Sequence, residues 1–247
     1  MRALITGAAQ GIGKATALAY ARASYDLVLI DINAAGAEKA AAECQALGAK
    51  ATSLVCDVTD EAQVEGVVKQ AAAQLGGLDI LVNTAAWLDP PIPVAEMPKE
   101  VWDRSITTDL TSVFLCSKHA LQVMIPQGTG GRVINLSSGA GRRGRANRSS
   151  YGAAKAAIIN LTESIALEVG QYGITCNAIC PGGVIGDRSL NIHRQLAERQ
   201  GRSREEGERE YEQMKNRYVT EEQVAELCVF LASPQASRIN GQNIGIG

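Results

Sequence analysis

The strongest constraint on the fold is a repeated alternation of short aliphatic runs with longer, alanine-rich segments of helical periodicity. Runs that are apolar on both faces and bounded by turn residues are typical of strands buried in a parallel sheet. They are RALIT (2–6), DLVLID (26–31), ATSLVCDV (51–58), LDILVN (78–83), GRVINLSS (131–138), GITCNAIC (173–180) and QNIGI (242–246). Strand–helix alternation places helices on both faces of the sheet. The sequence therefore predicts an α/β fold with a doubly wound, seven-stranded parallel sheet.

One segment interrupts this alternation. Residues 187–217 are dense in charge and poor in aliphatic side chains, which predicts one or two amphipathic helices inserted after the sixth strand. Because ligands bind beyond the carboxyl ends of such strands, we interpret the insertion as a helical lid over a substrate site. The alternative is that residues 187–217 form a solvent-exposed surface insertion that covers no site. No repeat or linker divides the chain, so we expect a single domain over residues 1–247.

Composition argues against several functional classes. The net charge is −2 and charged residues make up 20% of the chain, so no basic field favours nucleic acid or a membrane surface. Six scattered cysteines and two histidines argue against disulfides and against a metal site. The first residues enter a strand and a glycine motif instead of a signal sequence, and no apolar run has the length of a membrane span. We therefore expect a cytoplasmic protein.

A glycine-rich loop between the first strand and the first helix predicts a dinucleotide site. In TGAAQGIG (6–13) the glycines allow a tight turn and a close approach of the backbone to a pyrophosphate at the helix N-terminus. Asp31 ends the second strand, where an acid hydrogen-bonds the adenosine ribose and repels a 2′-phosphate. The predicted cofactor is NAD rather than NADP, held by Gly7, Gln10, Gly11, Ile12, Gly13 and Asp31.

Tyr151 and Lys155 form a second candidate site. Residues four apart lie on one face of a helix, so the lysine ammonium would stand beside the phenol. A nearby cation favours the phenolate and brings the phenol closer to a useful general base. As an isolated pattern, the pair would more often be two unrelated side chains on a surface helix.

Together the motifs resemble the short-chain dehydrogenase/reductase family over essentially the whole chain. The family's TGxxxGxG corresponds to residues 6–13 and its YxxxK to Tyr151 and Lys155. Its serine, thirteen residues before the tyrosine, corresponds to Ser138 (151 − 138 = 13). Asp57 matches the acid after the third strand, and CPGG (180–183) matches the proline and glycine after the sixth. The resemblance implies a Rossmann fold, an NAD-linked oxidoreductase and a homotetramer or homodimer.

The resemblance also implies a role for each matched residue. Tyr151 acts as general base toward an alcohol or general acid toward a ketone, while Lys155 lowers its pKa and holds the nicotinamide ribose. Ser138 orients the substrate oxygen. Further cofactor contacts are implied at Asp57, Val58, Asn83, Pro181, Gly182 and Val184.

Three positions depart from the family pattern. Asp109 stands where relatives have an asparagine that holds a water in the proton relay, and we expect it to act there with a charge that affects the phenol. Ala86 replaces a glycine near the cofactor, and Gly186 stands in the place of a threonine. A dinucleotide-binding protein without catalysis therefore stays as an alternative, although Ser138, Tyr151 and Lys155 together favour an enzyme.

The substrate is predicted from one short segment. ANRSSY (146–151) resembles the segment in which 3-hydroxybutyrate dehydrogenases hold the substrate carboxylate, and Arg148 occupies the place of their lysine. A guanidinium can bind a carboxylate through two hydrogen bonds. Trp87 and Leu88 suggest a bulkier or partly apolar substrate. We therefore expect a hydroxy acid or other anionic alcohol, with a polyol, sugar or cyclic alcohol as the alternative.

The same family has dimers and tetramers that pair two long helices. Here the corresponding segments, around residues 108–125 and 151–168, are rich in apolar side chains. They include Val113, Phe114, Leu115, Ile158, Ile159 and Leu161. Helices this apolar either face the sheet or pair with another copy of the chain.

Overall fold

Seven strands form one parallel sheet in the computed structural model, which describes all residues from Met1 to Gly247. Their order is β3-β2-β1-β4-β5-β6-β7, and every neighbouring pair is parallel. The strands are β1 (Arg2–Thr6), β2 (Asp26–Asp31), β3 (Ala51–Val55), β4 (Ile80–Asn83), β5 (Gly131–Leu136), β6 (Ile174–Pro181) and β7 (Asn243–Ile246). The predicted doubly wound sheet is confirmed. Because β1 lies between β2 and β4, the chain winds outward in both directions and leaves a crevice at the carboxyl ends of the central strands.

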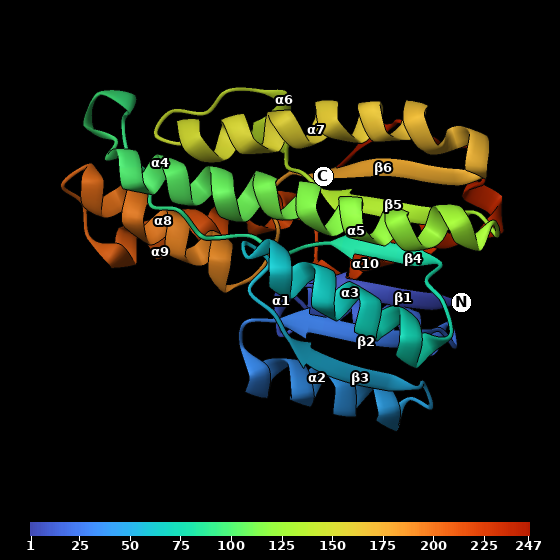
Figure 1. Ribbon diagram of the computed structural model, residues 1–247. Helices are drawn as coiled ribbons and strands as arrows, with labels where there is room; N and C mark the ends of the chain where they lie inside the picture. The colour runs from blue at the N-terminus through green and yellow to red at the C-terminus, as the bar shows by residue number, and fades with distance from the viewer.

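Helices cover both faces of the sheet (Figure 1). One face packs against α1 (Gly11–Arg22), α2 (Ala34–Ala46) and α10 (Glu221–Ala232), and the other against α3 (Glu61–Leu75), α5 (Ser112–Gln127) and α7 (Ser149–Val169). Each face has its own cluster of buried, mostly aliphatic residues. Helix starts follow local sequence: the Asp60 carboxylate accepts the N–H groups of Ala62 and Gln63, and Thr220 with Gln223 forms a capping box.

Shorter helices surround the carboxyl end of the sheet. They are α4 (Lys99–Ile106), α6 (Gly139–Arg142), α8 (Asp187–Arg199) and α9 (Arg204–Met214), with 3-10 turns at Val94–Glu96 and Lys215–Arg217. Two more 3-10 turns, Gly170–Tyr172 and Pro234–Ala236, lie at the other end of the sheet, before β6 and β7. A π-helical turn, Thr107–Thr111, joins α4 to α5 without a break. Single π-helical turns are rare in proteins overall, and those that occur are often found at functional sites.

The charged insertion forms a helical hairpin of α8 and α9. Figure 1 shows the pair beside α4, beyond the end of the sheet to which the strand arrows point. Aromatic side chains fix the hairpin: His193 Nε2 lies 2.7 Å from the Tyr218 hydroxyl, and Tyr211 accepts the Gly186 N–H at 3.0 Å. The insertion therefore packs on the carboxyl ends of the strands instead of extending into solvent.

Half of the six apolar residues of α5 and α7 named above are buried. Val113, Leu115 and Ile158 are buried within the one chain, whereas Phe114 is 46% exposed. Leu167, which the sequence did not single out, is 86% exposed on α7. None of the helices combines the length and the apolar composition that crossing a lipid bilayer requires.

Candidate active site

A cleft of about 1590 Å³ opens at the carboxyl ends of the strands, above the point where the strand order reverses. Its walls are the loops that follow β1, β2, β3, β4, β5 and β6, together with the hairpin of α8 and α9. It contains all the predicted cofactor-binding and catalytic residues except Asn83 and Asp109.

The glycine loop is packed so tightly that side chains are excluded. Gly7 and Gly11 have positive φ angles of 64° and 61°, which disfavour other residues. A Cβ atom on Gly7 would lie 2.7 Å from Ala85 Cα, and one on Gly13 would lie 2.2 Å from the carbonyl oxygen of Gly7. The result is a bare helix N-terminus facing the cleft, which fits the pyrophosphate of a dinucleotide.

Two carboxylates, Asp31 and Asp57, line the cleft near the glycine loop. Asp31 Oδ2 accepts the Ala9 N–H and its Oδ1 accepts the Asn33 N–H, each at 2.9 Å. Asp57 Oδ1 is held by the N–H and hydroxyl of Thr59 at 2.9 and 2.7 Å. The lysines and arginines that line the cleft all lie elsewhere, near Tyr151 and the hairpin. This end is therefore suited to a ribose with free hydroxyls and not to a phosphate ester.

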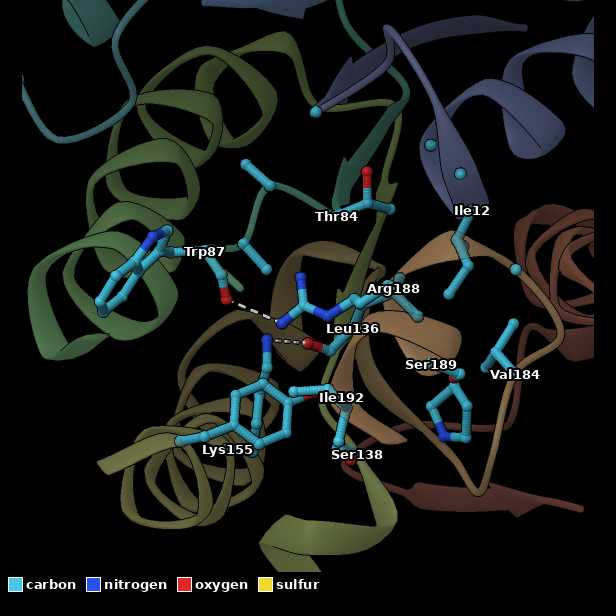
Figure 2. A pocket seen from close by; sticks show the side chains of 18 of the residues that line it. Ile12, Thr84, Trp87, Leu136, Ser138, Lys155, Val184, Arg188, Ser189 and Ile192 are labelled. Atoms are coloured by element: carbon cyan, nitrogen blue, oxygen red, sulfur yellow. Dashed lines mark hydrogen bonds between the residues drawn. The ribbon is translucent and has the colours of Figure 1, made fainter. Parts of the chain in front are cut away.

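The tyrosine, lysine and serine meet at the opposite end of the cleft. Lys155, on the second turn of α7, is buried, and its Nζ donates to the Leu136 carbonyl at 2.9 Å (Figure 2). The same Nζ lies 5.6 Å from the centroid of the Tyr151 ring. Ser138 begins α6 and its Oγ accepts the Ala140 N–H at 3.1 Å. The turn after β5 and the first two turns of α7 thus bring Ser138, Tyr151 and Lys155 into one corner.

Positive charges make the Tyr151 phenol unusually acidic. Burial raises the pKa of Tyr151, but the charges of Lys155 and Arg188 and the hydroxyl of Ser138 more than offset burial, so that the pKa is below its ordinary value. A phenol tuned in this direction is a better general base at neutral pH.

Asp109 lies behind this corner, on the π-helical turn, and is completely buried. Its Oδ1 accepts the Trp87 N–H at 2.7 Å, while its Oδ2 has no hydrogen-bond partner in the protein. Burial raises the pKa of Asp109, and the charges of Lys155 and Arg188 oppose this only in part. Because its charge in turn raises the pKa of Tyr151, Asp109 acts on the phenol from a distance without lining the cleft.

The side chain of Asn83 points away from the cleft. As the last residue of β4 it turns its side chain into the protein, where it donates to Asn135 Oδ1 at 2.8 Å and to Ser117 Oγ at 3.2 Å. It is 3% exposed. Its side chain therefore joins the strands to α5 and is not available to the cofactor.

The prediction for Arg148 assumed a free guanidinium, whereas the structure shows a paired one. Its Nη2 lies 2.9 Å from Oδ1 of the fully buried Asp89, and its Nη1 donates to the Asp89 carbonyl at 2.7 Å. The Ser150 hydroxyl donates to the same carboxylate at 2.9 Å. The guanidinium packs over the Tyr151 ring, 4.6 Å from its centroid. Arg148 is thus already neutralised by Asp89, and it lies at the wall of the site without a free charge for a substrate anion.

Two residues of the cleft were not assigned a role from the sequence. Figure 2 shows Arg188, from the first turn of α8, reaching across the cleft toward Trp87. Its Nη2 donates to the Trp87 carbonyl at 2.7 Å, and its Cζ lies 5.5 Å from the Tyr151 ring centroid. Arg104 of α4 stacks on the Trp87 ring, 4.4 Å from its centroid. No sequence signal distinguishes these arginines from others in charged helices.

The sheet, the glycine loop and the tyrosine–lysine pair together define a class, the oxidoreductases that use a nicotinamide dinucleotide. Known proteins share the arrangement. A family model described as enoyl-(acyl carrier protein) reductase matches residues 7–246. The chain belongs to the short-chain dehydrogenase/reductase family.

Its relatives include enzymes of alcohol oxidation. Sorbitol dehydrogenase of Cereibacter sphaeroides is 36% identical, over 99% of this chain and 94% of that protein. Cis-4-hydroxycyclohexanecarboxylate dehydrogenase of Sinomonas cyclohexanicum is 38% identical, with the same two coverages of 99% and 94%. The crystal structure of NAD⁺-bound xylitol dehydrogenase matches with a TM-score of 0.93 and 33% identity, over 99% of this chain and 96% of that one. The protein is therefore an oxidoreductase that acts on alcohol or ketone groups.

Proposed function

We propose that the protein is an NAD-dependent dehydrogenase of polyols or cyclic secondary alcohols, in which Tyr151 takes the hydroxyl proton. The observation that carries this proposal is the environment of Tyr151: Lys155 Nζ and Arg188 Cζ lie 5.6 and 5.5 Å from its ring centroid, and their charges lower the phenol pKa. Relatives named for sorbitol and for a hydroxycyclohexanecarboxylate support both substrate classes.

NAD is preferred over NADP because of charge. Asp31 would accept hydrogen bonds from the adenosine ribose, and the same carboxylate would repel a 2′-phosphate. No lysine or arginine lines the cleft near Asp31 to compensate, since the cleft's cationic residues are Arg104, Arg145, Arg148, Lys155 and Arg188. The relative of known structure that carries NAD⁺ supports this preference. When bound, the nicotinamide takes the hydride from an alcohol or returns it to a ketone.

The residues of this chain handle the proton. Ser138 orients the substrate oxygen, and the Tyr151 phenolate accepts the hydroxyl proton as the carbonyl forms. Lys155 stabilises the phenolate and is itself fixed: its Nζ donates to Leu136, and its own carbonyl accepts the Ser137 hydroxyl at 2.7 Å. A non-catalytic dinucleotide-binding protein would need no such arrangement of three groups.

Reduction of NAD across a panel of polyols, sugars and cyclic alcohols tests the proposal. We expect turnover with at least one class, and a loss of about 100-fold or more in kcat with Tyr151→Phe, because general base catalysis typically contributes that much. NADH binding, followed by fluorescence, should survive the substitution. Tyr172→Phe, at a tyrosine that is 44% exposed and outside the cleft, is the matched control. Full activity of Tyr151→Phe would contradict the proposal.

The proposal extends to assembly. Phe114 on α5 and Leu167 on α7 are exposed apolar side chains on the two helices that pair in dimers and tetramers of the family. Burial of such residues between copies would stabilise a homo-oligomer. A monomeric mass in sedimentation or light scattering would contradict this part.

A further inference from the structure

The cationic groups around Tyr151 outnumber the carboxylates. Three cationic groups lie over or beside its ring: Lys155, Arg148 and Arg188. Two buried carboxylates face them, and of these Asp89 is committed to Arg148. Asp109 is the remaining anion, and burial raises its pKa. Even with Asp109 fully ionised, one of the three cations has no carboxylate partner in this corner. The Tyr151 phenolate adds a negative charge only until it takes the hydroxyl proton.

Arg188 is the cation without a carboxylate partner. Lys155 is buried and fixed to a backbone carbonyl, and Arg148 is 10% exposed and ion-paired. Arg188 lines the open cleft, forms no ion pair, and makes one hydrogen bond, to the Trp87 carbonyl. Its neighbour Asp187 is exposed at the start of α8 and lies outside ion-pairing distance of the guanidinium. Most of the five N–H donors of the guanidinium are therefore free in the cleft.

The Arg188 guanidinium lies close enough to Tyr151 to contact the same substrate molecule. The guanidinium carbon is 5.5 Å from the Tyr151 ring centroid, so one small molecule can place a hydroxyl at the phenol and a second group at Arg188. The indole of Trp87 and the side chains of Ile192 and Leu196 add apolar surface to the lining of the cleft. A guanidinium beside apolar surface suits a carboxylate joined to a hydrocarbon ring or chain.

We infer that Arg188 binds a carboxylate of the substrate, so that the preferred substrates are secondary alcohols that carry an anionic group. This inference rests on the proposed function and names its substrate class more closely. The carboxylate would replace the Trp87 carbonyl as the partner of the guanidinium and would accept two parallel hydrogen bonds. Arg188 would thereby do what the sequence led us to expect of Arg148.

A matched pair of substrates tests the inference. We would compare 3- and 4-hydroxycyclohexanecarboxylates with the corresponding carboxamides, which keep shape and lose charge. We expect wild-type kcat/KM to favour the acids by about 10-fold or more, because charge-assisted hydrogen bonds are stronger than neutral ones. Arg188→Gln should lower the acid-to-amide ratio of kcat/KM by a similar factor, since its effect on the Tyr151 pKa applies to both substrates and cancels in the ratio. Arg188→Lys should retain part of the preference.

Binding is measured independently of turnover. Cyclohexanecarboxylate, which has no hydroxyl group, would be titrated calorimetrically into the enzyme with NADH, and Arg188→Gln should weaken its binding about 10-fold. Arg143→Gln is the control, since Arg143 is exposed and does not line the cleft. Melting temperatures of both variants establish that they fold.

The outcomes separate the two proposals. Equal use of acid and amide by the wild type, or equal effects of Arg188→Gln on both, overturns the role of Arg188 and leaves the alcohol dehydrogenase standing. Absence of NAD reduction with every acid, amide, polyol and cyclic alcohol overturns both.

Discussion

Arg148 and Asp89 form an ion pair that joins the turn before Tyr151 to the loop after β4, with Nη2 and Oδ1 2.9 Å apart. The two segments also share a bridge between Ile92 and Arg148. Because the Arg148 guanidinium packs on the Tyr151 ring, the pair fixes one side of the phenol. Because Asp89 is completely buried, its charge and that of Arg148 are each stabilised mainly by the other.

Asp89→Ala should therefore destabilise the protein strongly. Removal of one partner from a buried pair leaves an uncompensated charge and typically costs about 3–5 kcal/mol of unfolding free energy. Urea denaturation would measure the loss. Asp103→Ala, at an exposed pair with Lys99 on α4, is the control and should cost less than about 1 kcal/mol. An unchanged urea midpoint for Asp89→Ala would contradict the structural role of the pair.

A second prediction concerns cofactor choice. Asp31→Asn keeps a hydrogen-bond acceptor but removes the charge, so the preference of kcat/KM for NAD over NADP should fall by about 10-fold or more, the order of a hydrogen bond to a charged group. Asp26→Asn, at the opposite end of the same strand and away from the cleft, should leave the preference unchanged. Equal efficiency of the wild type with both cofactors would refute the assignment of Asp31.

A third prediction concerns pH. Alcohol oxidation needs the Tyr151 phenolate, so kcat should rise with pH through the lowered pKa of that group. The charge of Asp109 raises the pKa of Tyr151, and Asp109→Asn should therefore move the rise in kcat to lower pH. Arg188 has the opposite effect on the pKa, and Arg188→Gln, assayed with a neutral alcohol, should move the rise to higher pH. Shifts in the same direction for both variants would contradict the electrostatic account.

Sequence periodicity sufficed for the sheet because parallel strands are buried on both faces and leave a simple apolar pattern. The ends of the strands were less predictable. The run expected at residues 51–58 ends as a strand at Val55, because Asp57 turns the chain by binding the N–H and hydroxyl of Thr59. Local polar bonds of this kind compete with the sheet and leave no periodic signal.

The glycine loop and the tyrosine–lysine pair were likewise accessible to sequence reasoning, since their partners are a few residues away. Arg148 was not, because its partner Asp89 is 59 positions distant and nothing local indicates that the two charges meet. The sequence did not single out Arg188 either, but for a different reason. It lies in a segment where charged residues are the rule, and only the packing of α8 on the cleft separates it from solvated arginines.

A last prediction concerns the hairpin that carries Arg188. Gly207 of α9 touches the backbone of α8, and a Cβ atom there would lie 2.5 Å from the His193 carbonyl oxygen. Gly207→Ala must therefore push the two helices apart, at a cost of about 1–3 kcal/mol typical of overpacking. Because the hairpin packs on one end of the sheet, we expect the effect to be local: faster amide exchange in residues 187–217 and a higher KM for the alcohol, with core exchange unchanged. Gly66→Ala on α3, where no atom lies within 4 Å of the added Cβ, is the control. Unaltered exchange and KM in Gly207→Ala would show that the hairpin does not shape the substrate site.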